Sequence, residues 1–271
     1  MEFLQNIENR GYPTDYIVAR IHGRRVSLFS NWDMLLFNPD INEHLRPTHY
    51  GEFVSMYSVE GIWQCYRKEL HWIYFQMNQR LRDIFQPYFI YSELGTLMTG
   101  LRFKLGKGNK AEIDYLLSYS LLAEHIKDTM RAETDVPSIL RVIERSLLLA
   151  SGKSLDLPEI YMENGFQKTE ESLRQTVFAY IFSLPMHHII KSFFSALVNK
   201  LNLLALYKHL KWGITAKPAF IDGGSIPEHG FQRIIASQTI DEIVQLIYKQ
   251  TGLYLEKGDV PRLDAGRNHA H

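Results

Sequence analysis

The chain has a single cysteine, Cys65, among its 271 residues. One thiol cannot close an internal disulfide, and it cannot supply a cysteine-based zinc site, so neither device can stabilise this fold. We expect Cys65 to serve as a small apolar side chain on a helix, in a protein of a reducing compartment.

The chain also has no net charge, because 30 basic side chains balance 30 acidic ones. Nothing in this balance indicates a nucleic-acid partner. Residues 1–20 have no uninterrupted apolar core of the kind that a signal peptide needs. The most apolar region, residues 176–207, is interrupted by Pro185, Lys191 and Lys200 well before the roughly 20 apolar residues of a membrane span. We therefore expect membrane contact to be peripheral only.

The usual sequence motifs of catalysis and metal binding are missing. There is no HExxH, CxxC, GxSxG or P-loop pattern. The adjacent His187 and His188 point to different faces of a helix and cannot easily share a metal. We predict no catalytic residue, no cofactor and no metal site. Scattered polar side chains can still meet in a pocket between helices, so an enzyme stays open as a less favoured class.

Sustained apolar–polar alternation is also missing, and the sequence predicts an all-α protein with many helices. The longest periodic seam runs from Ile62 to Ile84, and it predicts one helix that ends at Gln86-Pro87. Residues 113–130 and 139–150 predict two further helices, the second starting near Asp135. We expect Thr169 to cap another helix, which Pro185 interrupts.

The central stretch of the chain is residues 193–235. Its first half has helical periodicity, with asparagines and lysines between the apolar positions, and Gly213 provides the helix stop. A corner at residues 220–224 follows, with a double glycine. Ser225 and Glu228 then have the spacing of a capping box. The double glycine lacks the GxGxxG spacing of a dinucleotide site, so we interpret the corner as structural.

A second, weaker copy of this stretch lies upstream. Residues 94–106 read LGTLMTGLRFKLG, and residues 201–213 read LNLLALYKHLKWG. Two leucines, one lysine and the closing glycine coincide when the two segments are aligned without gaps. The pair suggests a repeated unit of helix, basic cluster and glycine turn.

These motifs, in their order, resemble the C subunit of rotary A-type and V-type ATPases, which is called subunit d in eukaryotes. The likeness rests on LR-x-K at residues 101–104, the F-x-x-GG-x-I-P pattern at residues 220–227, the DYIVAR helix opening at residues 15–20 and the LRPTHY step at residues 45–50. The family pattern has an asparagine ahead of LR-x-K. The second copy has Asn202 at this position, whereas the first copy departs from the pattern with Gly95.

The resemblance implies a single all-helical domain with a funnel-like arrangement of three pseudo-repeated units. We place these units at residues 14–86, 87–165 and 166–255, followed by a polar tail at residues 256–271. It also implies a non-catalytic subunit on the cytoplasmic side of the membrane. Its partners would be the central-stalk subunits and the membrane proteolipid ring, and it would couple ATP turnover to proton or sodium transport.

The two basic repeat turns are the candidate partner contacts. The residues are Arg102, Lys104 and Lys107 in the first turn and His209, Lys211 and Trp212 in the second. We choose them by position, because cations at an exposed turn suit an acidic protein surface or anionic lipid headgroups. A diverged helical adaptor that has the same fold but acts outside the ATPase is the alternative reading.

Overall fold

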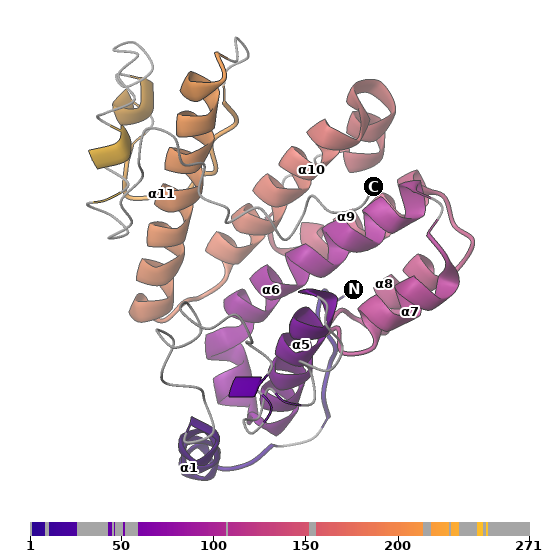
Figure 1. Cartoon of the computed structure of the whole chain (residues 1–271), viewed down its shortest axis with the longest axis vertical. Coiled ribbons are helices and arrows are strands. Elements are labelled where there is room, and N and C mark those ends of the chain that lie inside the picture. The colour runs from indigo at the N-terminus through magenta and orange to yellow at the C-terminus, as the bar shows by residue number, and fades with distance from the viewer. Residues whose placement is uncertain are drawn as a thin grey trace. The chain divides into compact units, whose positions relative to one another are not determined.

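The computed structural model describes residues 2–8, 11–25, 43–44, 46, 51, 59–106, 108–151, 156–213, 218–227, 229–232, 243–245 and 248. Helices dominate this part of the chain, as Figure 1 shows, and the predicted all-α class is confirmed. Its one isolated β-bridge joins Leu4 to Leu122 in an antiparallel sense. The tail at residues 256–271 lies outside the described residues.

The chain divides into two compact units between Glu133 and Thr134. The unit of residues 2–133, here the N-terminal unit, holds α1 (Thr14–Arg25), α5 (Val59–Gln76), α6 (Gln79–Leu105), α7 (Lys110–Leu117) and α8 (Glu124–Arg131). The unit of residues 134–271, here the C-terminal unit, holds α9 (Val136–Ser151), α10 (Leu157–Ser183) and α11 (His188–Lys211). The three pseudo-repeats and the funnel shape stay predictions.

Helix α6 is the core element of the N-terminal unit. Its residues Ile90, Leu97 and Leu101 are fully buried, and α7 and α8 both pack against it. Gly100 permits the close approach of α8, because a Cβ at this position would lie 2.0 Å from the Cε of Met130. The apolar residues of α6 therefore form the centre of the core of this unit.

The expected single helix from Ile62 to Pro87 is wrong, because the chain breaks at Met77-Asn78. Asn78 caps α6, since its side-chain oxygen accepts a hydrogen bond from the Leu81 amide at 3.1 Å. The N-terminal segment fills this break: Tyr12 N donates to Gln76 O at 2.9 Å, and Asn78 Nδ2 donates to Tyr12 O at 3.1 Å. Pro87 does not end a helix but lies inside α6, where its ring is buried.

The predicted helix over residues 113–130 is also wrong, because it is two helices, α7 and α8, with residues 118–123 between them. Thr169 does not cap a helix either. It lies inside α10, and its hydroxyl donates to the carbonyl of Gly165 at 2.9 Å. Gly165 has φ 77° and kinks α10.

Helices α9 and α10 pack along each other in the C-terminal unit (Figure 1). Asp135 stands at the start of α9 as predicted, where its carboxylate accepts from the Ser138 amide at 3.0 Å. Pro185 separates α10 from α11, also as predicted. Gly213 follows the end of α11 with φ 58°, so the predicted glycine stop is confirmed.

Candidate partner-binding surfaces and the clamps that position them

A row of short polar side chains on α11 holds the double-glycine corner. Ser195, Asn199 and Asn202 are spaced four and three residues apart, so they share one face of the helix. The two asparagines are 1% and 3% exposed. We call these three residues the corner clamp.

The corner clamp acts on the backbone of residues 221–226. The Asn202 side chain accepts from Ile221 N at 2.9 Å and donates to Ile221 O at 2.8 Å. Asn199 Oδ1 accepts from Ile226 N at 3.1 Å, while its Nδ2 donates to Ser225 Oγ at 2.7 Å. The predicted partner of Ser225, Glu228, lies outside the described residues.

The two corner glycines pack closely against α10 and α11. Ser195 Oγ donates to Gly223 O at 2.8 Å, and a Cβ on Gly223 would lie 2.3 Å from the ring of Phe182. A Cβ on Gly224 would lie 2.5 Å from Asn199 Oδ1. Gly223 also has φ 101°, a region that glycine adopts without strain. The close packing explains the double glycine, and it supports the structural reading of the corner.

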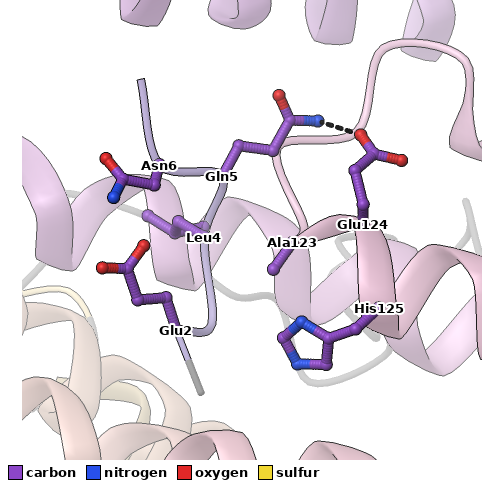
Figure 2. Close-up of a pocket in the computed structure, with 7 residues that line it drawn as sticks. All are labelled: Glu2, Leu4, Gln5, Asn6, Ala123, Glu124 and His125. Atoms are coloured by element: carbon purple, nitrogen blue, oxygen red, sulfur yellow. Dashed lines mark hydrogen bonds between the residues drawn. The ribbon is translucent and has the colours of Figure 1, made fainter. Parts of the chain in front are cut away.

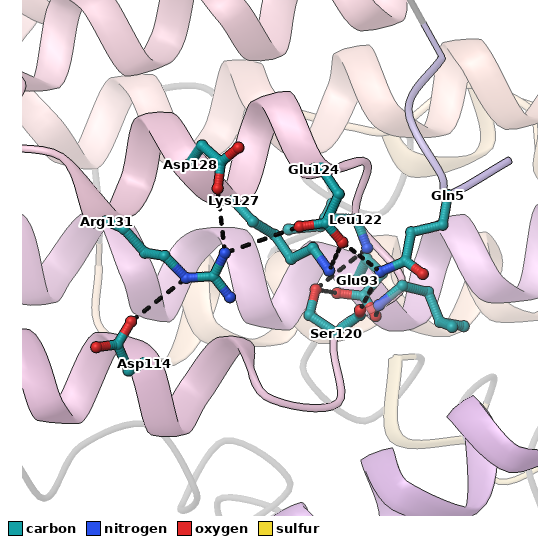
Figure 3. Close-up of polar contacts among 10 residues, drawn as sticks. Gln5, Glu93, Asp114, Ser120, Leu122, Glu124, Lys127, Asp128 and Arg131 are labelled. Carbon is teal, nitrogen blue, oxygen red and sulfur yellow. Dashed lines mark hydrogen bonds and ion pairs between the residues drawn. The ribbon is translucent and has the colours of Figure 1, made fainter.

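In the N-terminal unit, the buried side chain of Glu93 likewise holds a non-helical segment of the backbone (Figure 3). Its carboxylate accepts from Ser120 Oγ at 2.8 Å and from Leu121 N at 2.7 Å. The carboxyl is completely buried, and this burial raises its pKa above the ordinary value. Hydrogen bonds to the ionised form and the positive charge of Arg67 oppose that rise. Glu93 therefore fixes the path of the non-helical segment between α7 and α8.

The N-terminal segment lies along the other side of residues 120–123. Gln5 N donates to Leu121 O at 2.8 Å, and Ala123 N donates to Phe3 O at 3.0 Å. The phenyl ring of Phe3 is buried. A pocket of about 420 Å³ lies beside this contact. Figure 2 shows its lining residues Glu2, Leu4, Gln5, Asn6, Ala123, Glu124 and His125.

Two of the side chains that line this pocket contact each other. Gln5 Nε2 donates to Glu124 Oε1 at 3.2 Å across it, so the glutamine and the carboxylate are engaged with each other. Glu124 also pairs with the nearly buried Lys127 at 2.6 Å. Among the described residues, no group of three or more His, Cys, Asp or Glu side chains could hold a metal. The pocket lies between the N-terminal segment and residues 123–125.

An ion-pair chain on α8 continues from the pocket (Figure 3). Arg131 lies 3.3 Å from Asp114, 3.2 Å from Asp128 and 3.8 Å from Glu124. These carboxylates are largely exposed, so each pair stabilises the unit only slightly. Asp114 belongs to α7, and the network therefore ties α7 to α8.

The first group of predicted contacts lies at the end of α6. Arg102 and Lys104 are in its last turn, where cations are favourable against the helix dipole. Lys104 Nζ donates to Ala132 O at 2.5 Å, so this side chain also closes the end of α8. Lys107 lies outside the described residues.

The second group lies at the end of α11. His209 and Lys211 are in its last turn, and Trp212 follows with 56% of its side chain exposed. Lys211 Nζ lies 5.6 Å from the ring centroid of the buried Tyr207. Tryptophan is among the residues enriched at contact surfaces. The two predicted groups belong to different compact units, and each is described by itself.

Helix α11 is long and apolar enough to cross a membrane, by length and composition alone, within the part of the chain that the structure describes. Core helices pass the same test. Phe194 and Val198 are fully buried, and Phe194 meets Phe178 of α10 edge-on at a centroid distance of 6.4 Å. These contacts favour the reading of α11 as a core helix.

The family model for the ATP synthase (C/AC39) subunit matches residues 17–259 of this chain. The chain belongs to this family. No curated protein and no solved structure matches it. The resemblance predicted from the ordered motifs is therefore confirmed, since the match begins in the DYIVAR helix and extends beyond the double-glycine corner.

The hydrogen bonds of this C/AC39 subunit show which buried polar residues the sequence analysis overlooked. Asn199 and Asn202 were interpreted only as polar positions between apolar ones, and Glu93 was not selected. A signal was present in both cases. Ser195, Asn199 and Asn202 repeat on one helix face, and Glu93 is an acidic residue within the apolar run of α6. A polar side chain at a core position usually satisfies a backbone group elsewhere.

Proposed function

We propose that the chain is a non-catalytic coupling subunit of a rotary V-type or A-type ATPase, which joins the central stalk to the membrane proteolipid ring. The family match over residues 17–259 carries this proposal. In this role the protein transmits torque between ATP turnover and proton or sodium transport. It stays on the cytoplasmic side and touches the membrane only peripherally.

The construction of the two helix ends supports this role. A subunit that transmits torque needs contact surfaces on rigid supports, since a loose segment would absorb the rotation. Helix α6 is held through Glu93 and Lys104, and α11 is held through the corner clamp. Both helices end in basic turns that suit acidic partner surfaces. Arg102, His209, Lys211 and Trp212 are the contacts we propose.

The test is a native pull-down of the tagged protein from the membranes of its host in mild detergent, followed by mass spectrometry. We expect catalytic ATPase subunits and the proteolipid to co-purify in fixed proportion. Recovery of the protein alone, in the soluble fraction, would overturn the proposal and favour the adaptor reading.

Charge reversal then tests the contacts. Arg102→Glu and Lys211→Glu should each reduce the recovery of ATPase subunits, because each places an anion where an acidic partner surface is expected. Arg80→Glu, at an exposed position in the first turn of α6, is the matched control and should leave recovery unchanged. If all three variants recover equally less of the ATPase subunits, the loss does not depend on which cation is reversed, and Arg102 and Lys211 are not specific contacts.

A further inference from the structure

One asparagine in the sequence, Asn164, is followed directly by a glycine. The pair lies at the kink of α10, where Gly165 has φ 77° and ψ −178° and so interrupts the helical backbone. An asparagine before glycine is chemically labile. Its side-chain carbonyl carbon can meet the next backbone nitrogen in a five-membered ring, and glycine has no side chain to block that approach. The surroundings of the pair decide whether the ring can close in the folded protein.

The surroundings of this pair are open. Asn164 and Gly165 are both exposed, and so are Met162 and Glu163 before them. A Cβ on Gly165 would meet no atom within 4 Å. Solvent therefore reaches the peptide unit between the two residues, and no packed side chain opposes a local rotation of it.

The side chain of Asn164 also differs from the other asparagines on the helices. Asn78 and Asn109 cap α6 and α7 by accepting from backbone amides at 3.1 and 2.9 Å. Asn199 and Asn202 belong to the corner clamp. Each of these four side chains is held by hydrogen bonds, whereas no hydrogen bond of the Asn164 side chain occurs in the described part of the chain.

A second pair in the same unit, Asp222-Gly223, shows what packing does to such a site. An aspartate before glycine can close the same ring, and Asp222 is exposed. However, Gly223 is fixed on both sides, because its carbonyl accepts from Ser195 Oγ at 2.8 Å and a Cβ on it would lie 2.3 Å from the ring of Phe182. Ring closure there would have to displace the double-glycine corner. Ring closure at Asn164 displaces nothing.

We propose that Asn164 is a site of spontaneous deamidation, with water as the only co-reactant. The backbone nitrogen of Gly165 attacks Cγ of Asn164 and forms a new C–N bond. The side-chain nitrogen leaves as ammonia and takes up the proton that the Gly165 amide gives away. Water then opens the cyclic imide at one of its two carbonyls, which yields either aspartate or isoaspartate at position 164.

The two products differ in what they do to α10. Both add a carboxylate to an exposed segment that already has Glu159 and Glu163. An aspartate keeps the backbone unchanged, and its charge is favourable at the start of the helical turns that follow Gly165. An isoaspartate carries the main chain through the side-chain carbon and so lengthens the backbone by one methylene at the kink. The modification therefore changes the charge of the segment in every case and its backbone in one case.

The experiment is incubation of the purified full chain in mildly alkaline buffer, followed by peptide mapping with mass spectrometry. We expect the peptide that contains Asn164 to gain about one dalton, because an NH₂ group is replaced by an OH group. The modified fraction should grow with time and faster at higher pH, since the attacking nitrogen must lose its proton. A carboxyl methyltransferase specific for isoaspartate should then transfer a methyl group from S-adenosylmethionine to the same peptide.

The effect of the fold is measured by a parallel incubation of the chain unfolded in guanidinium chloride. We expect Asn164 to react at comparable rates in the folded and the unfolded chain. Isomerisation of Asp222 should be slow in the folded chain and faster in the unfolded one, because the packing around Gly223 is then lost.

Two variants locate the site. Asn164→Gln should abolish the mass gain and the methyl transfer, because glutamine would have to close a larger ring. Asn6→Gln makes the same substitution at an exposed asparagine that precedes an isoleucine, and it should leave both signals unchanged. Circular dichroism checks that each variant stays folded.

Three results would overturn the inference: an unmodified Asn164 in the folded chain while the unfolded chain reacts, equal modification of Asn164 and Asp222 in the folded chain, or methyl transfer that persists in Asn164→Gln. The incubation contains no ATPase subunit, so none of these results bears on the proposed function.

Discussion

Asn202 and Ile221 are joined by two hydrogen bonds, in which the side-chain amide of Asn202 satisfies both the N–H and the C=O of Ile221. The pair imitates one step of a β-ladder, but one of its partners is a helix side chain. It lies in the interior, where backbone groups without a partner are costly. The position of the double-glycine corner on α11 depends on it.

Asn202→Ala should lower the free energy of unfolding by about 2 to 4 kcal/mol, because both groups of Ile221 lose their partner in a buried place. Urea unfolding followed by circular dichroism measures the change. Lys200→Ala, two residues away and more exposed, is the control and should change stability by about 0.5 kcal/mol or less. Equal effects would mean that the pair does not stabilise the corner.

Gly223→Ala should be destabilising by about 1 to 3 kcal/mol, because the new Cβ meets the ring of Phe182 and the backbone has φ 101°. Gly95→Ala is the matched comparison. Nothing lies within 4 Å of its Cβ, and Gly95 is inside α6, so this change should be stabilising by about 0.5 to 1 kcal/mol. Thermal unfolding of the two variants should shift in opposite directions.

Glu93 should make stability depend on pH. Burial raises the pKa of this carboxyl in the folded state above its ordinary value of 4.5, so the folded state binds the proton more strongly than the unfolded state. The contribution of Glu93 is therefore fully present below pH 4.5 and is lost as the pH rises through the folded-state pKa.

The measurement is the urea midpoint of the wild type and of Glu93→Gln across this pH range. The stability of the wild type relative to the variant should fall as the pH rises, because glutamine does not titrate. A difference that grows with pH would show that the hydrogen bonds from Ser120 and Leu121, together with Arg67, outweigh burial.

Phe3→Ala should loosen the N-terminal unit, because it leaves a cavity beside residues 120–123. The expected cost is about 3 to 5 kcal/mol. Hydrogen exchange with mass spectrometry should show faster exchange in α8 and unchanged exchange in α10, which belongs to the other unit. Asn6→Ala, at an exposed position of the same segment, should leave both helices unchanged.

The helix breaks show the limit of periodicity as a guide. The apolar seam from Ile62 to Ile84 has no interruption in its spacing, yet the chain breaks at Asn78. The break is stabilised by Tyr12, which is far away in the sequence. The gap between α7 and α8 likewise depends on Glu93. The partners in these contacts are distant in the sequence, so apolar periodicity alone joined helices that tertiary contacts separate.

The prediction of the partner contacts also lacked information on contacts between residues that are distant in the sequence. Position in the repeat predicted Arg102 and Lys211 in turns between helices, whereas the structure has them inside the last turns of α6 and α11. It could not show that Lys104 is engaged with Ala132, because that carbonyl belongs to another helix. Whether these residues meet a partner stays a prediction.

The sequence by itself determined the helical class, the helix ends at Pro185 and Gly213, and the family. These follow from local chemistry and from the order of motifs: proline cannot donate a backbone hydrogen bond, glycine tolerates positive φ, and apolar spacing defines a helix face. Only the tertiary structure decided which polar side chains are buried. Glu93, Asn199 and Asn202 lie inside because distant backbone groups need partners there, and that need exists only once the chain has folded.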